Sequence, residues 1–424
     1  MYKYLVSGVL LTSTFTAHAA GFALIEQSAS GMGNAFAGAA AVAEDASTIY
    51  FNPAGMTYIE GTQIIGGLHL ISPNADFNNQ GSIAATARPL GNEGGDAGDL
   101  ALIPNIYYKR DLTETLKFGL GINSLFGLKT EYDKNWIGRF QAVKSELKTI
   151  NINPALAFKV NDQLSLGAGL SAMRVEANLT SAVNFGPFGE GYSSVKGSDW
   201  GFGLNLGAIY QTTADTRLGV AFRSKVEQHL DGNVTFTHPA GLPAPFVAAT
   251  PDGAISADVT LPENLSVSLF SHINDKWDLL GDVTWTNWSR FQEIKIVRDN
   301  GSTLTSTTEN WHNTMRYSMG VNYLYRDTLK LRAGLAYDEE AISDNYRTPR
   351  IPGNDRKWLA LGLGWQATPA TKLDVGYAHL FISDASINDN QSTPVAPSPF
   401  SKGAVIGDYQ GSVDILSIQV SHHF

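Results

Sequence analysis

Residues 204–210 read Leu204-Asn205-Leu206-Gly207-Ala208-Ile209-Tyr210, in which apolar side chains recur at every second position from leucine to tyrosine. Successive side chains of a β-strand point to opposite faces, so this stretch has one apolar face and one face that carries Asn205 and Gly207. Residues 359–365 repeat the pattern, with leucine and tryptophan separated by alanine and glycine. An apolar face towards lipid and a small or polar face towards a lumen are typical of membrane β-barrels.

The connections between such strands are of two kinds. Short polar turns occur at residues 111–114, 161–163, 213–216, 273–275, 326–328 and 368–370. Longer segments alternate with them, at residues 73–100, 127–146, 179–199, 238–257, 298–310, 338–355 and 383–408. These thirteen connections predict an all-β membrane fold, a 14-stranded antiparallel transmembrane β-barrel over residues 62–424 with short periplasmic turns and long extracellular loops.

The last strand carries an assembly signal. Leu416, Ile418, Val420 and His422 share one face with the terminal Phe424. A terminal phenylalanine preceded by apolar residues at alternate positions resembles the signal that the barrel-assembly machinery recognises. We therefore expect this machinery as a partner, together with outer-membrane lipid and lipopolysaccharide.

Residues 1–19 have the features of a signal peptide. Lys3 precedes an apolar run over residues 5–15, and Ala17-His18-Ala19 offers small residues for cleavage after Ala19. No other stretch approaches the roughly 20 apolar residues of a membrane-spanning helix. The sequence therefore predicts an exported chain.

The composition excludes several classes of protein. A net charge of −10 argues against nucleic-acid binding, which needs a basic surface. The absence of cysteine excludes disulfides and thiolate metal sites. The many glycine, tyrosine and phenylalanine residues, with only 17% charged residues, resemble the composition of a barrel with aromatic girdles.

Residues 20–61 do not have the strand pattern. Residues 28–40 are rich in small side chains, and Glu44-Asp45 leads into Asn52-Pro53-Ala54-Gly55. A barrel of this size leaves a lumen that must be filled or wet, so we expect this segment to form a small N-terminal plug, or hatch, in the lumen. A periplasmic tail is the alternative, although its apolar density argues against disorder.

From Ala20 to Phe424 the chain resembles the FadL family of outer-membrane long-chain fatty acid transporters. The resemblance rests on stretches that occur in order along the chain: residues 21–24, 30–35, 52–54, 136–140, 153–157, 223–226, 261–266, 285–291, 346–352 and 354–356. It implies a hatch over residues 20–61, a detergent-like ligand pocket above the hatch, and a gap in the wall where the third strand kinks inward. It also implies passive uptake of long-chain fatty acids or similar hydrophobic molecules across the bacterial outer membrane.

Enzyme signatures are weak in this sequence. The glycines around residues 31–38 lack the preceding strand and acidic partner of a dinucleotide site, and no Gly-x-Ser-x-Gly, His-Glu-x-x-His or Walker pattern occurs. Adjacent His422 and His423 point to opposite faces of a strand and form no metal pair. We therefore expect no catalysis, cofactor or metal. A general porin and a barrel hydrolase remain minor alternatives.

Charged residues on the lumen side are candidates for ligand binding. Strand alternation places Arg223, Lys225, Asp282, Arg290, Arg316 and Arg332 inward. We rank Arg290, Arg316 and Lys225 as candidates to hold a fatty acid carboxylate, because charge-assisted hydrogen bonds are strong. Structural ion pairs across the lumen are the alternative for each of them. An unpaired cation would favour fatty acids over aromatic or alkane hydrocarbons, the second substrate class.

Capture and exit can be assigned to loops and strands. Residues 240–249 are an apolar stretch that has no reason to face water, so Leu242 and Phe246 are predicted to capture the acyl chain together with loop 179–199.

Lateral exit is predicted at the third strand, where Gly119, Gly121, Asn123 and Ser124 mark a bend at which the ladder can open. The hatch residues Asn52-Pro53-Ala54 are predicted to lie beside this opening. Alternatively, the two glycines only make room in a crowded lumen.

Overall fold

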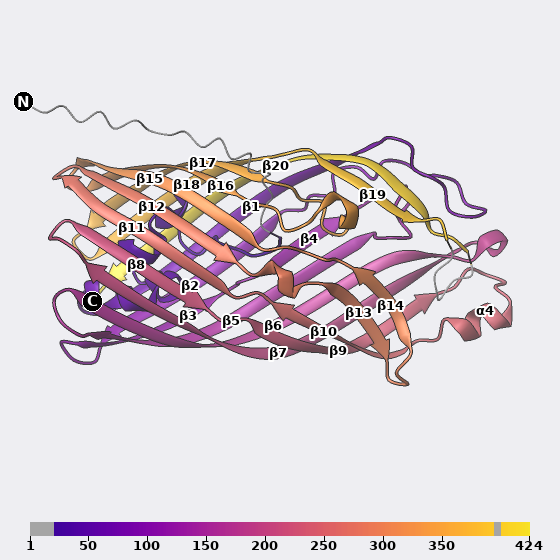
Figure 1. Ribbon diagram of the computed structural model, residues 1–424, viewed down its shortest axis with the longest axis horizontal. Coiled ribbons are helices and arrows are strands. Elements are labelled where there is room, and N and C mark those ends of the chain that lie inside the picture. Colours follow the sequence, from indigo (N-terminus) through magenta and orange to yellow (C-terminus); the bar gives the residue numbers. More distant parts are fainter. Residues whose placement is uncertain (1–20, 394–399) are drawn as a thin grey trace, which may run out of the picture.

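The strands of the computed structural model form one closed antiparallel barrel (Figure 1). The structure describes residues 21–393 and 400–424, so the predicted signal peptide lies outside the described residues. The first and last strands close the barrel, since they pair from Gln63 with His423 to Asn79 with Gly407. A closed ladder satisfies the backbone groups of the residues paired in it, which lipid cannot do.

Fourteen spanning strands make up the barrel within the described part of the chain, which confirms the predicted fold class. Eight are continuous: β1 (Gln63–Asn79), β2 (Ala101–Asp111), β5 (Lys144–Lys159), β6 (Leu164–Asn184), β7 (Glu190–Gln211), β16 (Leu329–Asp338), β17 (Arg356–Thr368) and β20 (Gly403–His423). Six are interrupted: β3 (Leu116–Asn123) with β4 (Gly127–Glu131), β8 (Thr216–Arg223) with β9 (Val226–Thr237), β10 (Gly253–Leu261) with β11 (Asn264–Asn274), β12 (Trp277–Thr286) with β13 (Glu293–Arg298), β14 (Thr303–Thr308) with β15 (Thr314–Arg326), and β18 (Thr371–Ile382) with β19 (Ala385–Gln391).

The two faces of the strands divide as the alternation predicts. Leu206 on β7 is 47% exposed towards the outside, whereas the neighbouring Asn205 is 2% exposed and faces the lumen. Leu359, Leu361 and Trp365 on β17 are likewise exposed. Among the described residues, no helix has both the length and the apolar character to span a membrane.

Several segments that the sequence predicts as loops are largely strand. β6 continues to Asn184 and β7 begins at Glu190, so only the short η2 (Gly186–Phe188) separates them in the predicted loop 179–199. The ladder continues because strand pairing satisfies the backbone of polar sequences as well as apolar ones. Of the other short helices, α4 (Ala244–Ala249) and η4 (Asp344–Tyr346) lie in long loops, and η3 (Trp288–Arg290) interrupts the wall between β12 and β13.

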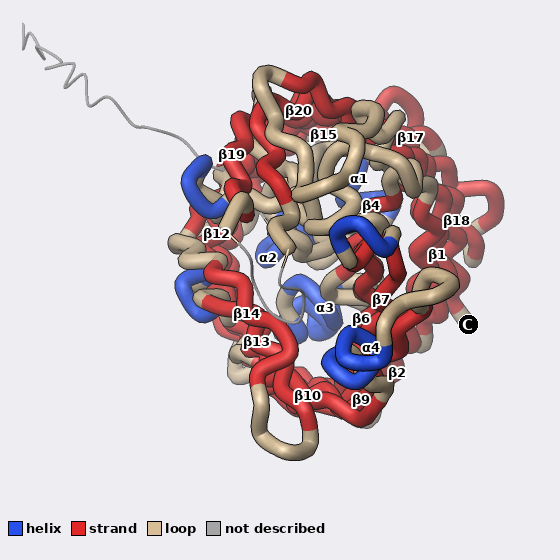
Figure 2. Tube along the Cα trace, turned by 90° about the vertical axis from the view of Figure 1, so that its right-hand side faces the viewer, coloured by secondary structure: helices blue, strands red, loops and turns tan. Residues whose placement is uncertain are grey.

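The segment before β1 fills the lumen as a plug. It contains α1 (Ala29–Met32), α2 (Ala39–Val42), α3 (Thr48–Phe51) and η1 (Pro53–Tyr58). Figure 2 shows α1, α2 and α3 inside the ring of strands. Two wall glycines allow the hatch backbone to touch the wall, because a Cβ at Gly167 would lie 2.3 Å from the Ala54 nitrogen and one at Gly219 would lie 2.0 Å from the Ala40 oxygen.

An ion-pair cluster anchors the hatch to the wall. The Glu44 carboxylate accepts hydrogen bonds from Lys330 at 3.0 Å, Arg332 at 2.9 Å and Lys372 at 2.8 Å. Burial alone would raise the pKa of Glu44, but these cations hold its pKa well below the usual value. Arg332, predicted to face inward, also pairs with the buried Asp374 at 2.9 Å. Its role is therefore structural, as the ion-pair alternative anticipates.

Candidate functional site

Three connected hollows lie above the hatch and in the barrel wall. We call them the lower cavity, next to the hatch; the upper cavity, towards the extracellular end; and the side cavity, which passes through the wall. Ala23, Leu24, Glu26 and Arg356 line both the lower and the side cavities, and Phe22 lines both the upper and the side cavities. The N-terminal residues of the hatch therefore stand where the three hollows meet.

The lower cavity combines charged and aromatic side chains in a volume of about 110 Å³. Hatch residues Phe36, Tyr50 and Phe51 form part of its lining, and Trp288 and Trp358 contribute from the wall. The lining also contains six charged residues: Glu26, Arg223, Asp282, Arg316, Asp338 and Arg356.

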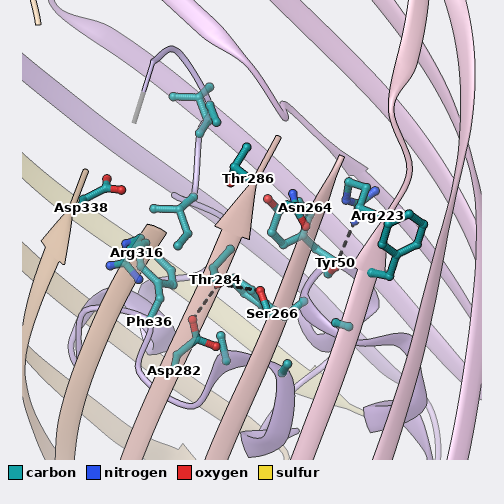
Figure 3. Close-up of a pocket in the computed structure, with 18 of the residues that line it drawn as sticks. Phe36, Tyr50, Arg223, Asn264, Ser266, Asp282, Thr284, Thr286, Arg316 and Asp338 are labelled. Atoms are coloured by element: carbon teal, nitrogen blue, oxygen red, sulfur yellow. Dashed lines mark hydrogen bonds between the residues drawn. The ribbon is translucent and has the colours of Figure 1, made fainter. Parts of the chain in front are cut away.

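Arg316 and Arg223 enter the lower cavity from opposite sides (Figure 3). Arg316 donates from Nη2 to the Ala35 oxygen at 2.9 Å and lies over the Trp358 ring at 5.1 Å. Arg223 donates from Nη2 to the Tyr50 oxygen at 3.0 Å and lies over the Tyr50 ring at 4.7 Å. Both guanidinium groups are buried. Each is thus held in place by a backbone oxygen of the hatch.

Unpaired hydrogen-bond donors are concentrated in the lining of this cavity. Six buried nitrogen atoms of its lining residues have no hydrogen-bond partner: Arg223 Nη1, Trp288 Nε1, Arg316 Nε, Arg316 Nη1, Arg356 Nε and Trp358 Nε1. A buried donor without an acceptor costs about 1–3 kcal/mol, and native proteins rarely leave one unsatisfied. The cavity therefore calls for a ligand with strong acceptor atoms.

The acids of the lower cavity do not use up these donors. Asp282 accepts hydrogen bonds from Ser268 and, at 2.8 Å, from Thr284. Among the described residues, no ion pair of 4.0 Å or less joins the cavity's arginines to its acids. Burial raises the pKa of Glu26, which belongs to the hatch. The arginines and acids of the lower cavity therefore interact electrostatically without forming direct ion pairs.

The upper cavity is almost wholly apolar. Its volume is about 100 Å³, and Leu147, Val175, Leu230, Ile255 and Phe291 are typical of its lining. It also contacts Arg350, whose guanidinium donates to the oxygens of Gln141, Lys144 and Ser145 and is thereby largely satisfied. Such a lining suits a hydrocarbon chain and offers little to a polar group.

The side cavity passes through a window in the barrel wall. Pairing between β2 and β3 ends at Ile106 with Ile122, and the two chains meet again at Gly98 with Thr130. Both chains advance by eight residues between these pairs (106 to 98, and 122 to 130), so they separate and rejoin without loss of register. The side cavity, of about 580 Å³, occupies this gap.

The lining of the side cavity comes from both faces of the wall. Leu102 and Ile150 are exposed on the outer face, whereas Phe126, Leu380 and Val413 face the interior. β5 pairs with both β3 and β4, at Asn151 with Asn123 and at Lys148 with Gly127. Between these two pairs the β3–β4 segment advances four residues and β5 only three. The extra residue pushes the chain inward, as a β-bulge does.

Hatch residues 22–27 lie against this inward kink. Leu24 donates its N–H to the Leu125 oxygen at 2.9 Å, and Gly127 donates to the Phe22 oxygen at 3.0 Å. The Gln27 side chain donates to the Ser124 oxygen at 2.6 Å. The Phe22 ring packs edge-on against Trp288, Phe291 and Trp311, which fixes the segment between the window and the cavities.

The four residues predicted at the opening divide between two roles. Gly119 and Gly121 lie in the regular ladder, paired with β2 and with β5. A Cβ at Gly119 would lie 2.5 Å from the Met56 sulfur, so this glycine makes room for the hatch. Asn123 is buried at the end of the ladder and bonds to Tyr107 and Asn151. Of the four, only Ser124 lines the side cavity. The prediction is therefore wrong for the two glycines, which make room in the lumen, as the alternative proposed.

The Asn52-Pro53-Ala54 motif is not beside the window, contrary to the prediction. The Asn52 side chain donates to the oxygens of Ala40 at 2.7 Å and Ala208 at 3.0 Å, and so ties the hatch to β7. Pro53 and Ala54 approach the wall at Gly167 on β6. The motif therefore joins the hatch to β6 and β7, on another part of the wall, where the Asn52 side chain bridges two backbone oxygens.

The inward orientation predicted for Lys225 and Arg290 is also wrong. Lys225 is 44% exposed and pairs with Glu227, and Arg290 is 43% exposed and pairs with Glu263. Between the Asn205–Arg223 and Ser198–Asp231 pairs, β7 advances seven residues and its partner eight, so a bulge after Arg223 reverses the side-chain parity. The short helix η3 turns Trp288 inward and Arg290 outward in the same way.

The predicted capture residues lie at the extracellular tip. Phe246 on α4 packs against Phe185, Phe188 and Phe400, with ring centroids 6.4, 5.3 and 6.1 Å away. Leu242, in the loop before α4, is half-buried. Phe188 and Val247 remain 41% and 40% exposed, so an apolar surface faces the outside here.

Three charged residues of the lower cavity were not predicted. Glu26 lies in the hatch, where no strand alternation indicates its direction, and Asp338 and Arg356 flank the long loop between β16 and β17. The inward parity of Arg332 on β16 could have indicated Asp338, six residues later.

Comparisons with known proteins agree with this architecture. The family model described as outer membrane protein transport protein (OMPP1/FadL/TodX) matches residues 9–424. The long-chain fatty acid transport protein of Escherichia coli O6:H1 is 30% identical over 409 residues, which cover 89% of this chain and 90% of that protein. A solved FadL homologue of Pseudomonas aeruginosa has a TM-score of 0.86 at 26% identity and covers 96% of this chain and 100% of its own.

A more distant solved structure has a similar fold. The Pseudomonas putida toluene transporter TodX has a TM-score of 0.70 at 16% identity, over 95% of this chain and 99% of its own. The barrel, its lumenal plug and the match over nearly the whole chain lead to one conclusion. The chain belongs to the OMPP1/FadL/TodX family of outer-membrane transport proteins.

Proposed function

We propose that this outer-membrane protein takes up long-chain fatty acids passively, and that the lower cavity binds the carboxylate head group. The observation that carries the proposal is the set of six unpaired buried donors in the lining of that cavity. A carboxylate presents two oxygen atoms with about four acceptor sites, and hydrogen bonds to it are charge-assisted. Arg316 is the central residue because two of its nitrogen atoms lack a partner.

The acyl tail would occupy apolar surroundings above the head group. Burial of a tail contributes roughly 0.8 kcal/mol per methylene without any specific contact. The upper and side cavities provide that lining, and the side cavity shares Leu24 with the lower cavity and Phe22 with the upper cavity. The Phe246 surface at the extracellular tip is our candidate for the first contact with substrate.

We also propose that substrate leaves sideways into the bilayer through the window between β2 and the β3–β4 kink. A tail released into the periplasm would lose the burial that drove its capture, whereas a lateral route keeps it in apolar surroundings. The side cavity supports this route because its lining includes lipid-facing and interior residues. The Glu44 cluster, which ties the hatch to the wall, argues against passage through the periplasmic mouth.

Uptake of aromatic or alkane hydrocarbons is the second candidate. The upper cavity favours it, since its lining offers almost no polar contact. A hydrocarbon, however, would leave the donors of the lower cavity unsatisfied. The comparison of a fatty acid with an alcohol of equal chain length therefore separates the two candidates.

The test measures binding of decanoate and of decanol to the purified protein in amphipol. In the Arg316→Gln variant, decanoate binding is expected to weaken by roughly 1.5–3 kcal/mol, about ten- to a hundredfold, because a hydrogen bond to a charged group is lost. Decanol binding is expected to change little. Arg326→Gln is the matched control, since Arg326 lies on the same strand but is exposed beside Tyr325. Equal binding of decanoate and decanol to the unaltered protein would favour the hydrocarbon candidate.

A further inference from the structure

The lower cavity has no excess of positive charge. Its lining contains three arginines, Arg223, Arg316 and Arg356, and three acids, Glu26, Asp282 and Asp338. Two further acids lie just behind it, since Glu340 interacts with Arg356 and Asp355 with Asp338. With every group ionised, the three arginines and the three acids of the lining cancel, so the cavity is neutral.

A fatty acid carboxylate would therefore bring an uncompensated negative charge into a buried site. Burial of an unpaired charge costs several kcal/mol, and a buried group usually changes its protonation state instead. The arginines can satisfy the hydrogen bonds of the carboxylate without cancelling this extra charge, because their charge is already balanced by the acids.

We propose that each fatty acid binds to the lower cavity together with one proton taken from solution. The inference rests on the proposed function and adds its proton linkage. The proton forms an O–H bond with a carboxylate of the cavity, so one acid becomes neutral and the ligand carboxylate takes its place opposite the arginines. The total charge of the cavity stays the same before and after binding.

Glu26 is the acid best placed to receive this proton. It faces Arg356 on β17, Arg316 on β15 and Asp338 on β16, and the Tyr50 hydroxyl on α3 lies near it. Asp282 on β12 and Arg223 on β8 complete the charged groups around the cavity. Glu26 is buried, and burial raises its pKa, so protonation there costs less than at an exposed acid.

The position of Glu26 connects the proton to the exit route. Glu26 lines both the lower cavity and the side cavity that opens through the window. If the O–H bond of Glu26 breaks and a new O–H bond forms on the ligand carboxylate, the ligand becomes an uncharged acid and Glu26 regains its charge. An uncharged acid can enter lipid through the window at far lower cost than a carboxylate.

The experiment is calorimetric titration of decanoate into the protein in amphipol, in phosphate and in Tris buffer. The difference in heat between buffers gives the number of protons taken up, and about one proton per decanoate is expected. Affinity should then rise about tenfold for each pH unit lowered, at pH values where free decanoate is ionised. Decanol is expected to take up no proton. Tight decanoate binding with no proton uptake would overturn the inference, whereas equal binding of decanoate and decanol would instead overturn the proposed carboxylate contact.

A variant tests the charge argument independently. Glu26→Gln removes one negative charge, so the cavity gains the positive charge that a carboxylate needs. Decanoate binding to this variant is expected to take up no proton and to become independent of pH. Glu114→Gln, in an exposed periplasmic turn, is the matched control and is expected to keep the proton uptake of the unaltered protein. Proton uptake that persists in Glu26→Gln would overturn the inference, and if that variant does not fold, the titration of the unaltered protein decides.

Discussion

Arg316 is held by the hatch on one side and remains unpaired on the other. Its Nη2 group donates to the Ala35 oxygen, while its Nε and Nη1 groups are buried without a hydrogen-bond partner in the lining of the lower cavity. A small movement of the hatch would therefore move the guanidinium group as well. If the lower cavity binds the carboxylate as we propose, the plug takes part in ligand binding in addition to filling the lumen.

The capture residues can be tested one side chain at a time. Changing Leu242 and Phe246 to serine removes two apolar side chains at the extracellular tip, including the contacts of Phe246 with Phe185 and Phe188, and leaves the barrel ladder untouched. Uptake of radiolabelled oleate by cells is expected to fall several-fold at limiting substrate and to recover at saturating substrate, because only the first contact is weakened. Unchanged uptake at limiting substrate would remove this surface from the route.

Single residues also show where sequence reasoning reaches its limit. Alternation places Arg223 and Arg316 inward correctly because each lies on an unbroken run of strand. The same reasoning fails for Lys225 and Arg290, since a one-residue bulge or a short 3₁₀-helix reverses the parity. Such an insertion leaves no composition signal. Glu26 could not be predicted at all, because no periodicity applies inside the hatch.

Among the elements, the interrupted third strand forms the proposed exit. β3 pairs with β2 as far as Ile122, and Thr130 on β4 pairs with Gly98, before β2, in the same register, which leaves a bounded window in place of an open edge. The sequence predicted a bend in this strand, but glycine was the wrong signal. The bend occurs at Ser124, Leu125 and Phe126, where backbone bonds to the hatch replace the ladder to β2.

A reversible covalent bridge across the window tests lateral exit. Pro104 and Ser124 would face each other if the register of β2 and β3 continued past Ile106 and Ile122, and the native chain has no cysteine. With cysteines at positions 104 and 124, oxidation is expected to abolish most oleate uptake and reduction to restore it, since the bridge closes the wall.

The matched control for this bridge lies in the intact ladder. Cysteines at positions 106 and 122 are directly paired on the lipid face, so oxidation there is expected to leave uptake unchanged. Full transport by the oxidised 104–124 variant, with the bridge verified by mass spectrometry, would exclude the window as the exit.

For the whole molecule, the sequence was most informative about the barrel. Period-two alternation and the sequence of short turns and long loops follow from the pleat and from the closure of the ladder, so the fourteen-strand count could be obtained without any contact information. The position of the plug in the lumen followed from the space that such a barrel encloses. The cavities could not be predicted, because they arise where hatch, kink and bulged strands meet.

The central claim is that this outer-membrane protein carries long-chain fatty acids by means of a carboxylate contact at Arg316. Its most direct test is uptake of labelled oleate and labelled toluene by cells that lack a fatty acid transporter of their own and express this chain or its Arg316→Gln variant. The claim predicts saturable oleate uptake that falls at least several-fold in the variant, with toluene uptake unaffected by the substitution. Oleate uptake no greater than in cells without the chain, together with raised toluene uptake, would contradict it.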